Sequence, residues 1–261
     1  MNISSIASSQ LQTSMIRIST GQRINSATDD AAGLAISESI GAQIRGLDRG
    51  TDNVLDMQNL VNTAEGGLDT ISNNLQRIRE LAVQANNGIL TEGNRQIIQT
   101  EIDQLLAEID STTQRVEFNS MRLLDGGFSA TDNRYLHTAG DAAGRGPTVV
   151  LGNMSSSMIL GPDPIDVVQE PLDLSRVDNA LSRVNAQRSY LGAMSNRFDT
   201  TVANNQITNL NLAAARSRIR DADIALEAMR MRQEETLQEA RLAAQQRQQD
   251  DEGINIMSLI G

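Results

Sequence analysis

The chain has 261 residues, a formal net charge of −11 and one histidine, and its 22 basic residues are all arginine. An acidic chain repels phosphate backbones, and no basic stripe with interleaved aromatic residues is present, so we expect no nucleic-acid partner. The absence of lysine and cysteine excludes a P-loop lysine, a Schiff base, disulfides and thiolate-bound metal. With no tryptophan, two tyrosines and three phenylalanines, the composition fits a thin helical bundle better than a globular core.

Residues 1–20 predict a short amphipathic helix that is marginal on its own. Its apolar positions recur at intervals of three or four residues and are Ile3, Ala7, Leu11, Met15 and Ile18. So thin a stripe buries little area unless another helix covers it. Ser19-Thr20-Gly21 ends this helix, and the run from Ser26 to Asp30 supplies N-cap candidates for the next one.

The segment from Gly33 to Ala85 predicts one long amphipathic helix around which the chain is organised. From Val54 onward its apolar residues alternate at intervals of three and four, as Val54, Met57, Val61, Ala64, Leu68, Ile71, Leu75, Ile78, Ala82 and Ala85. This seam keeps one stripe facing a partner helix. At ~1.5 Å per residue the helix would reach about 80 Å, so we expect a rod. Gly66-Gly67 is either a soft spot or a place where another backbone approaches closely.

Asn86-Asn87-Gly88 ends the long helix, and residues 91–116 predict a second helix antiparallel to it. Between residues 117 and 172, glycine and proline punctuate short apolar runs, among them residues 148–151 and 158–160. This composition predicts one or two β-hairpins built from short strands at the tip of the rod. His137 lies here without a second histidine, so we expect a solvent or packing residue and no ligand or base.

Helical periodicity resumes near Leu174 and continues to about Met229, and the sequence then becomes charged and rich in glutamine, as on a solvated helix face. Gly253 is expected to break the helix before a short apolar tail. The two chain ends should meet and stay disordered until a partner supplies burial. Identical segments of neighbouring copies, associating head to tail, would build a helical filament.

Four stretches resemble signature segments of the bacterial flagellins. They are residues 19–37, 74–85, 187–193 and 211–223. The family's order and spacing hold across most of residues 17–125 and 175–225. The resemblance implies a structural subunit that self-assembles into the bacterial flagellar filament for motility. Because little sequence separates the helical halves, the chain resembles a short form that lacks large variable outer domains.

The resemblance also implies a mainly α, elongated fold with two domains. Residues 1–28 and 220–261 would form an inner coiled-coil domain of terminal helices. Residues 29–219 would form a rod of long antiparallel coiled-coil helices, to which the segment 117–172 adds only small β-hairpins.

Two sets of residues are candidate contact sites. The first matches a family motif that serves contacts between subunits and is read by an animal innate immune receptor, and it consists of Gln76, Arg77, Leu81 and Glu101. Arg77 and Glu101 also fit solvated helix-face charges, whereas Leu81 lies off the seam and is expected to make an apolar contact outside the bundle. The second set is the apolar tail, expected to be needed for polymerisation: Ile254, Ile256, Met257, Leu259 and Ile260.

The partners implied are other copies of the chain in a homopolymer, a flagellar export chaperone, the filament cap, hook-junction proteins and, for the first set of residues, the immune receptor. The N-terminus lacks the pattern of a secretory signal, so we expect export through the flagellar type III system. The filament would then be extracellular, or periplasmic in some bacteria. No apolar run approaches the ~20 residues of a membrane-spanning helix, so no membrane partner is expected.

Two other functions stay open: a hook–filament junction protein, and a non-flagellar coiled-coil scaffold that would form a finite oligomer. The run from Asp29 to Gly33 favours a flagellin over a junction protein. An enzyme is not expected. One histidine, no lysine, no cysteine, no phosphate-binding loop and no His-Glu-x-x-His motif leave no set of residues for catalysis, metal binding or a cofactor.

Overall fold

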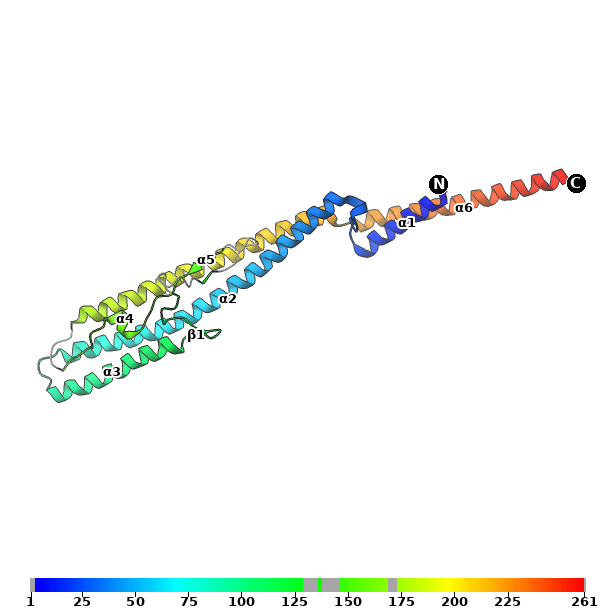
Figure 1. Cartoon of the computed structure of the whole chain (residues 1–261). Coiled ribbons are helices and arrows are strands. Elements are labelled where there is room, and N and C mark those ends of the chain that lie inside the picture. The colour runs from blue at the N-terminus through cyan, green and yellow to red at the C-terminus, as the bar shows by residue number, and fades with distance from the viewer. Residues whose placement is uncertain (1–2, 129–135, 138–145, 169–172, 261) are drawn as a thin grey trace. The chain divides into compact units, whose positions relative to one another are not determined.

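The computed structural model describes residues 3–128, 136–137, 146–168 and 173–260 (Figure 1). Within them the chain forms six helices and four short strands, which confirms the predicted mainly α fold. In chain order these are α1 (Ile3–Thr20), α2 (Ala27–Ala85), α3 (Glu92–Arg115), β1 (Glu117–Phe118), β2 (Met121–Arg122), β3 (Leu136–His137), β4 (Thr148–Val149), α4 (Ser156–Leu160), α5 (Leu174–Arg220) and α6 (Ile224–Ile260).

The chain divides into two compact units. The terminal unit consists of Met1–Ile44 and Leu210–Gly261, and the central unit consists of Arg45–Asn209. Each unit therefore contains part of α2 and part of α5. The domain bounds expected from the sequence, 1–28 with 220–261 and 29–219, stay a prediction.

The core of the central unit is built on the predicted seam of α2. All ten seam residues from Val54 to Ala85 are buried, and α3 and α5 supply the facing side of the core. On α3 the side chains of Ile98, Ile102 and Ile109 are buried, and on α5 the large Phe198 is fully buried. The heptad spacing therefore identified the core-facing stripe of the long helix correctly.

Polar pairs across α2 and α5 keep these two helices in one antiparallel register. Gln58 donates to Asp199 at 2.9 Å, Arg188 lies 3.0 Å from Asp69, and Arg79 donates to Asp178 at 2.7 Å. The three residues on α2 are eleven and then ten residues apart, and their partners on α5 have the same two spacings in the opposite chain direction. Exposed pairs of this kind contribute little energy each, so their effect is to favour one register over its neighbours.

The segment after α3 contains the predicted short strands. β1 pairs antiparallel with β2 around a two-residue turn, and β3 pairs antiparallel with β4. Both turn residues of the first hairpin have positive φ, 49° at Asn119 and 62° at Ser120, as a type I′ turn requires. The expectation of a strand at residues 158–160 is wrong, because they belong to α4. Asp110 holds the first turn of α4 by accepting from the backbone N–H and the hydroxyl of Ser156, both at 2.8 Å.

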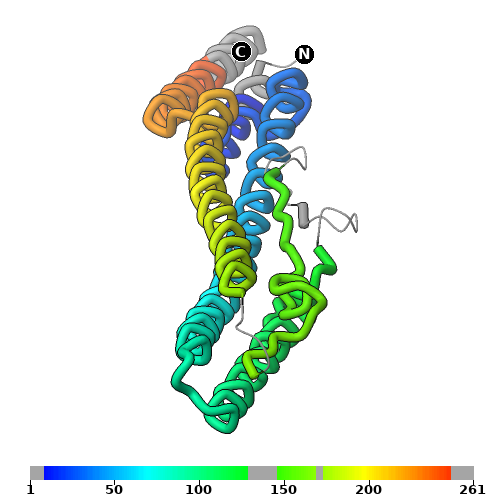
Figure 2. The backbone as a smooth tube through the Cα atoms, turned by 90° about the vertical axis from the view of Figure 1, so that its left-hand side faces the viewer, coloured from blue at the N-terminus to red at the C-terminus, as the bar shows by residue number. Residues whose placement is uncertain are grey.

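The later part of the segment 146–168 lies beside α3, as Figure 2 shows, and side chains of α3 and α5 bind the main chain of this segment. Gln99 of α3 donates to the carbonyl of Ile165 at 2.7 Å and accepts from the N–H of Val167 at 2.9 Å. From α5, Tyr190 donates to the carbonyl of Thr148 at 3.2 Å. Backbone groups that lack a strand partner are satisfied in this way.

In the terminal unit α1 lies along α6 (Figure 1). The connection from α1 to α2 and the connection from α5 to α6 are paired by backbone hydrogen bonds. Arg23 N–H donates to the carbonyl of Arg220 at 2.6 Å, and Ala222 N–H donates to the carbonyl of Gly21 at 3.0 Å. These bonds hold the start of α6 beside the residues that lead into α2.

Two expectations about the chain ends are wrong. Residues 3–20 and 224–260 are helical, and α1 finds a partner within the chain, because it lies along α6. Gly253 does not break the helix, since α6 continues to Ile260. A single helical glycine costs only about 1 kcal/mol, which a run of flanking helical hydrogen bonds offsets. No helix of the described residues is long and apolar enough to cross a membrane.

The two adjacent glycines of α2 have opposite surroundings and give a matched pair of substitutions. A Cβ on Gly66 would meet nothing within 4 Å, whereas a Cβ on Gly67 would lie 2.6 Å from a methyl group of Val116 and 3.0 Å from one of Leu124. We expect G66A to stabilise the protein by about 1 kcal/mol and G67A to destabilise it by roughly 1–3 kcal/mol. Urea unfolding followed by circular dichroism measures both. Equal effects of the two substitutions would contradict this packing.

Candidate interaction surfaces

Three of the four predicted patch residues lie together on the surface of the central unit. Gln76 and Arg77 are exposed on α2, and Glu101 lies opposite them on α3. The Nε and one terminal nitrogen of Arg77 donate to the same carboxylate oxygen of Glu101 at 2.9 and 2.8 Å. The other terminal nitrogen donates to Glu80 at 3.3 Å. A charged bridge therefore spans the two helices at this place.

Hydrogen bonds from Arg77 to Glu101, and then to Glu80, raise the pKa of the Arg77 guanidinium further above its ordinary value. The group is thus charged at every pH the protein meets. Both partners remain about half exposed in the bridge, and exposed ion pairs contribute little to stability. The arrangement is a fixed, charged surface rather than a strong clamp.

The expectation that Leu81 contacts something outside the bundle is wrong. Its side chain is 2% exposed and belongs to the core of the central unit. A helix that packs against two neighbours has a wider apolar sector than the two positions per heptad of a simple coiled coil. Leu60, also off the seam and 2% exposed, is buried for the same reason.

Three large apolar side chains near the turn between α2 and α3 are exposed, and none of them was among the predicted contact residues. Val83 is 49% exposed, Ile89 is 86% exposed and Ile97 is 70% exposed. The sequence signal for Val83 and Ile97 is a position off the apolar spacing of their helices, whereas Ile89 lies in the turn outside both helices.

The terminal helices expose a second set of apolar side chains. On α1 these are Met15 and Ile16, and on the described part of α6 they are Ile224, Leu226, Met229, Leu237 and Leu242. The tail residues Ile254, Ile256, Met257, Leu259 and Ile260 lie on the helical backbone of α6, and their side chains fall outside the described part of the chain. Their burial and contacts therefore stay a prediction.

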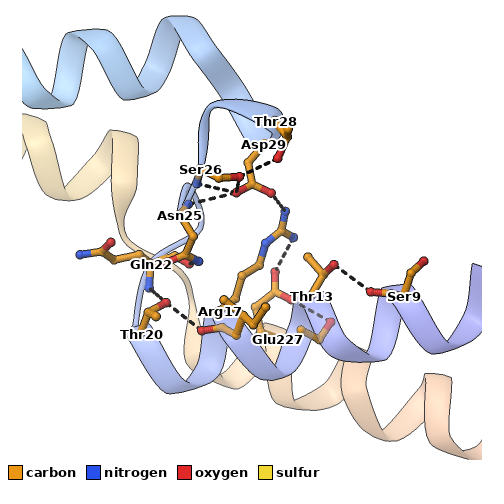
Figure 3. A network of polar contacts seen from close by, with 12 residues as sticks. Ser9, Thr13, Arg17, Thr20, Gln22, Asn25, Ser26, Thr28, Asp29 and Glu227 are labelled. Atoms are coloured by element: carbon orange, nitrogen blue, oxygen red, sulfur yellow. Dashed lines mark hydrogen bonds and ion pairs between the residues drawn. The ribbon is translucent and has the colours of Figure 1, made fainter.

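A network of polar contacts joins α1, the start of α2 and α6 (Figure 3). Arg17 of α1 lies between two carboxylates, 3.8 Å from Asp29 and 3.6 Å from Glu227. The Glu227 side chain is only 5% exposed and also accepts from Arg230 at 3.0 Å and from the Ser14 hydroxyl at 3.4 Å. A groove of about 400 Å³ beside it is lined by polar residues of α1 and α6.

Asp29 organises the turn that precedes the main body of α2. One of its carboxylate oxygens accepts from the N–H of Asn25 at 3.1 Å, and from the N–H and hydroxyl of Ser26 at 2.9 and 3.1 Å. The backbone hydrogen bonds from Ser26 and Asn25 lower the pKa of Asp29 below 3.8. Next to it, Asp30 has an extended backbone and accepts from the N–H of Gly33 at 2.8 Å, which is N-cap geometry. The predicted cap is thus confirmed.

The described residues contain no group of three or more histidine, aspartate or glutamate side chains arranged to hold a metal ion. Their carboxylates lie on helix faces, in ion pairs or at helix caps, as those of Asp29, Glu101 and Asp110 do. What the surfaces offer is charged and apolar contact area for another macromolecule.

Comparisons with known proteins identify relatives along nearly the whole chain. Residues 1–129 match the family model described as the bacterial flagellin N-terminal helical region, and residues 174–258 match the bacterial flagellin C-terminal helical region. The chain is 38% identical over 250 residues to a flagellin of Halalkalibacterium halodurans, covering 95% of this chain and 92% of the relative. It is 37% identical over 232 residues to the flagellar filament 33 kDa core protein of Treponema phagedenis, covering 83% and 81%.

Two solved structures are similar to the chain. The crystal structure of Bacillus cereus flagellin matches with a TM-score of 0.51 and 26% identity, and the match covers 59% of this chain and 88% of that one. The structure of a putative flagellar hook-associated protein from Vibrio parahaemolyticus matches with a TM-score of 0.60, covering 74% and 100%. At 17% identity, the second likeness concerns the fold alone.

We expect the D29N substitution to destabilise the protein at neutral pH and to lose this effect in acid. Asparagine keeps one acceptor oxygen but no charge. Because the pKa of Asp29 is lowered by folding, its contribution is complete above pH 3.8, the ordinary value, and is lost as the pH falls through the lower pKa of the folded state. Urea unfolding of D29N and the unsubstituted protein over this range tests it. A gap that stays constant down to the lowest pH would refute the expectation. D52N, in an exposed ion pair with Arg49, is the control.

Proposed function

The chain belongs to the bacterial flagellin family and is a structural subunit of the flagellar filament, and from this premise we propose which surfaces its copies use to associate. The first is the exposed apolar face of the terminal helices together with the tail of α6. The second is the charged patch formed by Gln76, Arg77 and Glu101 on the central unit.

The exposed apolar side chains of α1 and α6 carry the first part of this proposal. Within the chain α1 packs on α6, yet Met15 and Met229 are each more than half exposed. Burial of one such side chain contributes about 1.5–3 kcal/mol, and a second copy supplies that burial. The apolar tail residues extend the same helix and add to the contact.

The geometry of the patch supports its proposed role as a contact between subunits. Arg77 presents a guanidinium held by Glu101 and Glu80, and the side chain of the preceding residue, Gln76, is also exposed. We propose that the same patch, exposed in the free subunit, is what an animal innate immune receptor meets. Arginine suits such recognition, because its planar donors bind carboxylates in a defined geometry.

We further propose that the terminal helices form an inner domain, residues 1–28 and 220–261, and that residues 29–219 form the outer one. The division of the chain into two compact units supports a two-part organisation. Export through the flagellar type III system, with an export chaperone, the filament cap and hook-junction proteins as partners, follows as part of the same proposal. The filament is placed outside the cell or, in some bacteria, in the periplasm. No catalytic role is proposed.

Removing residues 254–261 should leave a folded monomer that no longer polymerises. The tail is expected to gain its burial only between copies, so its loss affects assembly and not the core of the central unit. Seeded growth followed by light scattering and negative-stain microscopy measures polymerisation, and circular dichroism measures helix content. Normal filament growth by the truncated chain would contradict the proposal that the tail is needed for polymerisation.

A matched pair of full-length variants controls for chain length in the tail experiment. In the first, Ile254, Ile256, Leu259 and Ile260 are replaced by asparagine, and in the second only the polar Asn255 and Ser258 are replaced, by glutamine and threonine. We expect the first to fail in assembly and the second to polymerise. Equal behaviour of the two would show that apolar contact by the tail is not required.

A charge swap separates two roles of Arg77, the ion pair with Glu101 within the chain and the proposed contact with a neighbouring copy. R77E should leave the free energy of unfolding almost unchanged, because the pair is exposed, and should strongly slow assembly. The double variant R77E/E101R restores the bridge within the chain but presents reversed charges to a neighbour. We expect it to regain the melting temperature and not the assembly rate. If the double variant assembles normally, Arg77 acts only within the chain; the exposed pair R49E/D52R is the control.

A further inference from the structure

The turn between α2 and α3 contains the single Asn-Gly dipeptide of the sequence, Asn87-Gly88. Asn86, Asn87 and Gly88 are all exposed to solvent. A Cβ at Gly88 would meet nothing within 4 Å, so the backbone here is open on the side from which water approaches. The assembly role of the patch and the tail does not use this dipeptide.

Hydrogen bonds fold the Asn87 side chain back over the peptide that follows it. The carbonyl of Asn87 accepts from the N–H of Leu90 at 3.2 Å, which closes a β-turn with Gly88 and Ile89 at its centre. The side-chain oxygen of Asn87 accepts from the N–H of Ile89 at 3.3 Å, forming an Asx turn inside the β-turn. The N–H of Gly88 makes no hydrogen bond to any described residue.

We propose that Asn87 is a site of spontaneous deamidation, for which water is the only co-reactant. The Gly88 nitrogen, after losing its proton to solvent base, attacks the side-chain carbonyl carbon Cγ of Asn87 and forms a new C–N bond. The bond from Cγ to the side-chain nitrogen then breaks, and that nitrogen takes up a proton and leaves as ammonia. The product is a five-membered succinimide, and no group is oxidised or reduced.

Hydrolysis completes the reaction. Water adds to one of the two ring carbonyls, and the ring C–N bond at that carbonyl breaks. Opening at the side-chain carbonyl gives aspartate, whereas opening at the main-chain carbonyl gives isoaspartate, in which the backbone runs through the former side chain. Either product places a new negative charge just beyond the C-terminus of α2, where the helix dipole is also negative.

The geometry at Asn87 favours each step. The hydrogen bond from Ile89 polarises the carbonyl that is attacked, and the Asx turn folds the side chain toward the Gly88 nitrogen, in the sense that ring closure needs. Because Gly88 lacks a side chain, no Cβ obstructs the approach. At Asn73, by contrast, the following amide lies inside α2, where it is held in the helical hydrogen-bond ladder.

The test is an incubation of the purified full-length protein in mildly alkaline buffer, followed by peptide mapping with mass spectrometry and by isoaspartyl methyltransferase labelling. We expect Asn87 to convert first, with both aspartate and isoaspartate as products, at a rate that rises with pH. Asn119, exposed in its own turn but followed by Ser120, should convert more slowly, and Asn73 most slowly. First conversion at either of these residues would overturn the proposal.

Two comparisons separate the effect of the fold from that of the dipeptide. G88A, which the open surroundings tolerate, should slow conversion of Asn87 by about tenfold or more by obstructing the approach, while circular dichroism stays unchanged. A synthetic peptide of residues 82–93 gives the rate without the fold. We expect the folded protein to react at least as fast as this peptide. A much slower protein would show that the turn protects Asn87, and an unaffected G88A would show that the open approach at Gly88 does not set the rate; either result would overturn the proposal.

Discussion

The buried stripe of α2 is the constraint on which the rest of the structure depends. Side chains such as Leu75 and Ile78 are fully buried, and each contributes about 1.5–3 kcal/mol, whereas an exposed ion pair contributes about 0–1 kcal/mol. The stripe therefore supplies the energy, and the polar pairs between α2 and α5 select the register. The buried sector of α2 is wide enough to include residues off the seam, such as Leu60 and Leu81, and two neighbouring helices are needed to cover it, which explains why α3 and α5 both lie along α2.

The terminal unit is held together differently. Among the side chains that the structure describes, its helix pair buries few large apolar ones, and the Arg17–Glu227 contact places the carboxylate of Glu227 in a site that is only 5% exposed. Buried ion pairs set geometry more than they add stability, because desolvation offsets the attraction. The backbone bonds between the two connections act in the same way. The several exposed apolar side chains described on α1 and α6 fit the proposed role of a surface completed by neighbouring copies.

Much of the fold follows from local rules that the sequence displays. The heptad intervals identify the buried face of α2, and the acidic run before it contains the cap that Asp30 provides. The burial of Leu81 could not be predicted from the heptad spacing, because it depends on how many helices pack around α2. Residues 158–160 were misjudged since a short apolar run fits strand and helix equally, and the deciding contact, Asp110 with Ser156, joins distant residues. The Arg77–Glu101 bridge likewise depends on the pairing of two helices.

The attachment of the segment 146–168 has a consequence for how this part of the chain can evolve. Gln99 and Tyr190 grip its amides and carbonyls, groups that every residue type except proline provides in full. Substitutions in the segment therefore keep these hydrogen bonds to the main chain, as long as buried apolar residues such as Leu151 and Val167 keep their size. Outward-facing positions are free to drift, so this stretch can change its surface chemistry while the helices beneath it stay the same.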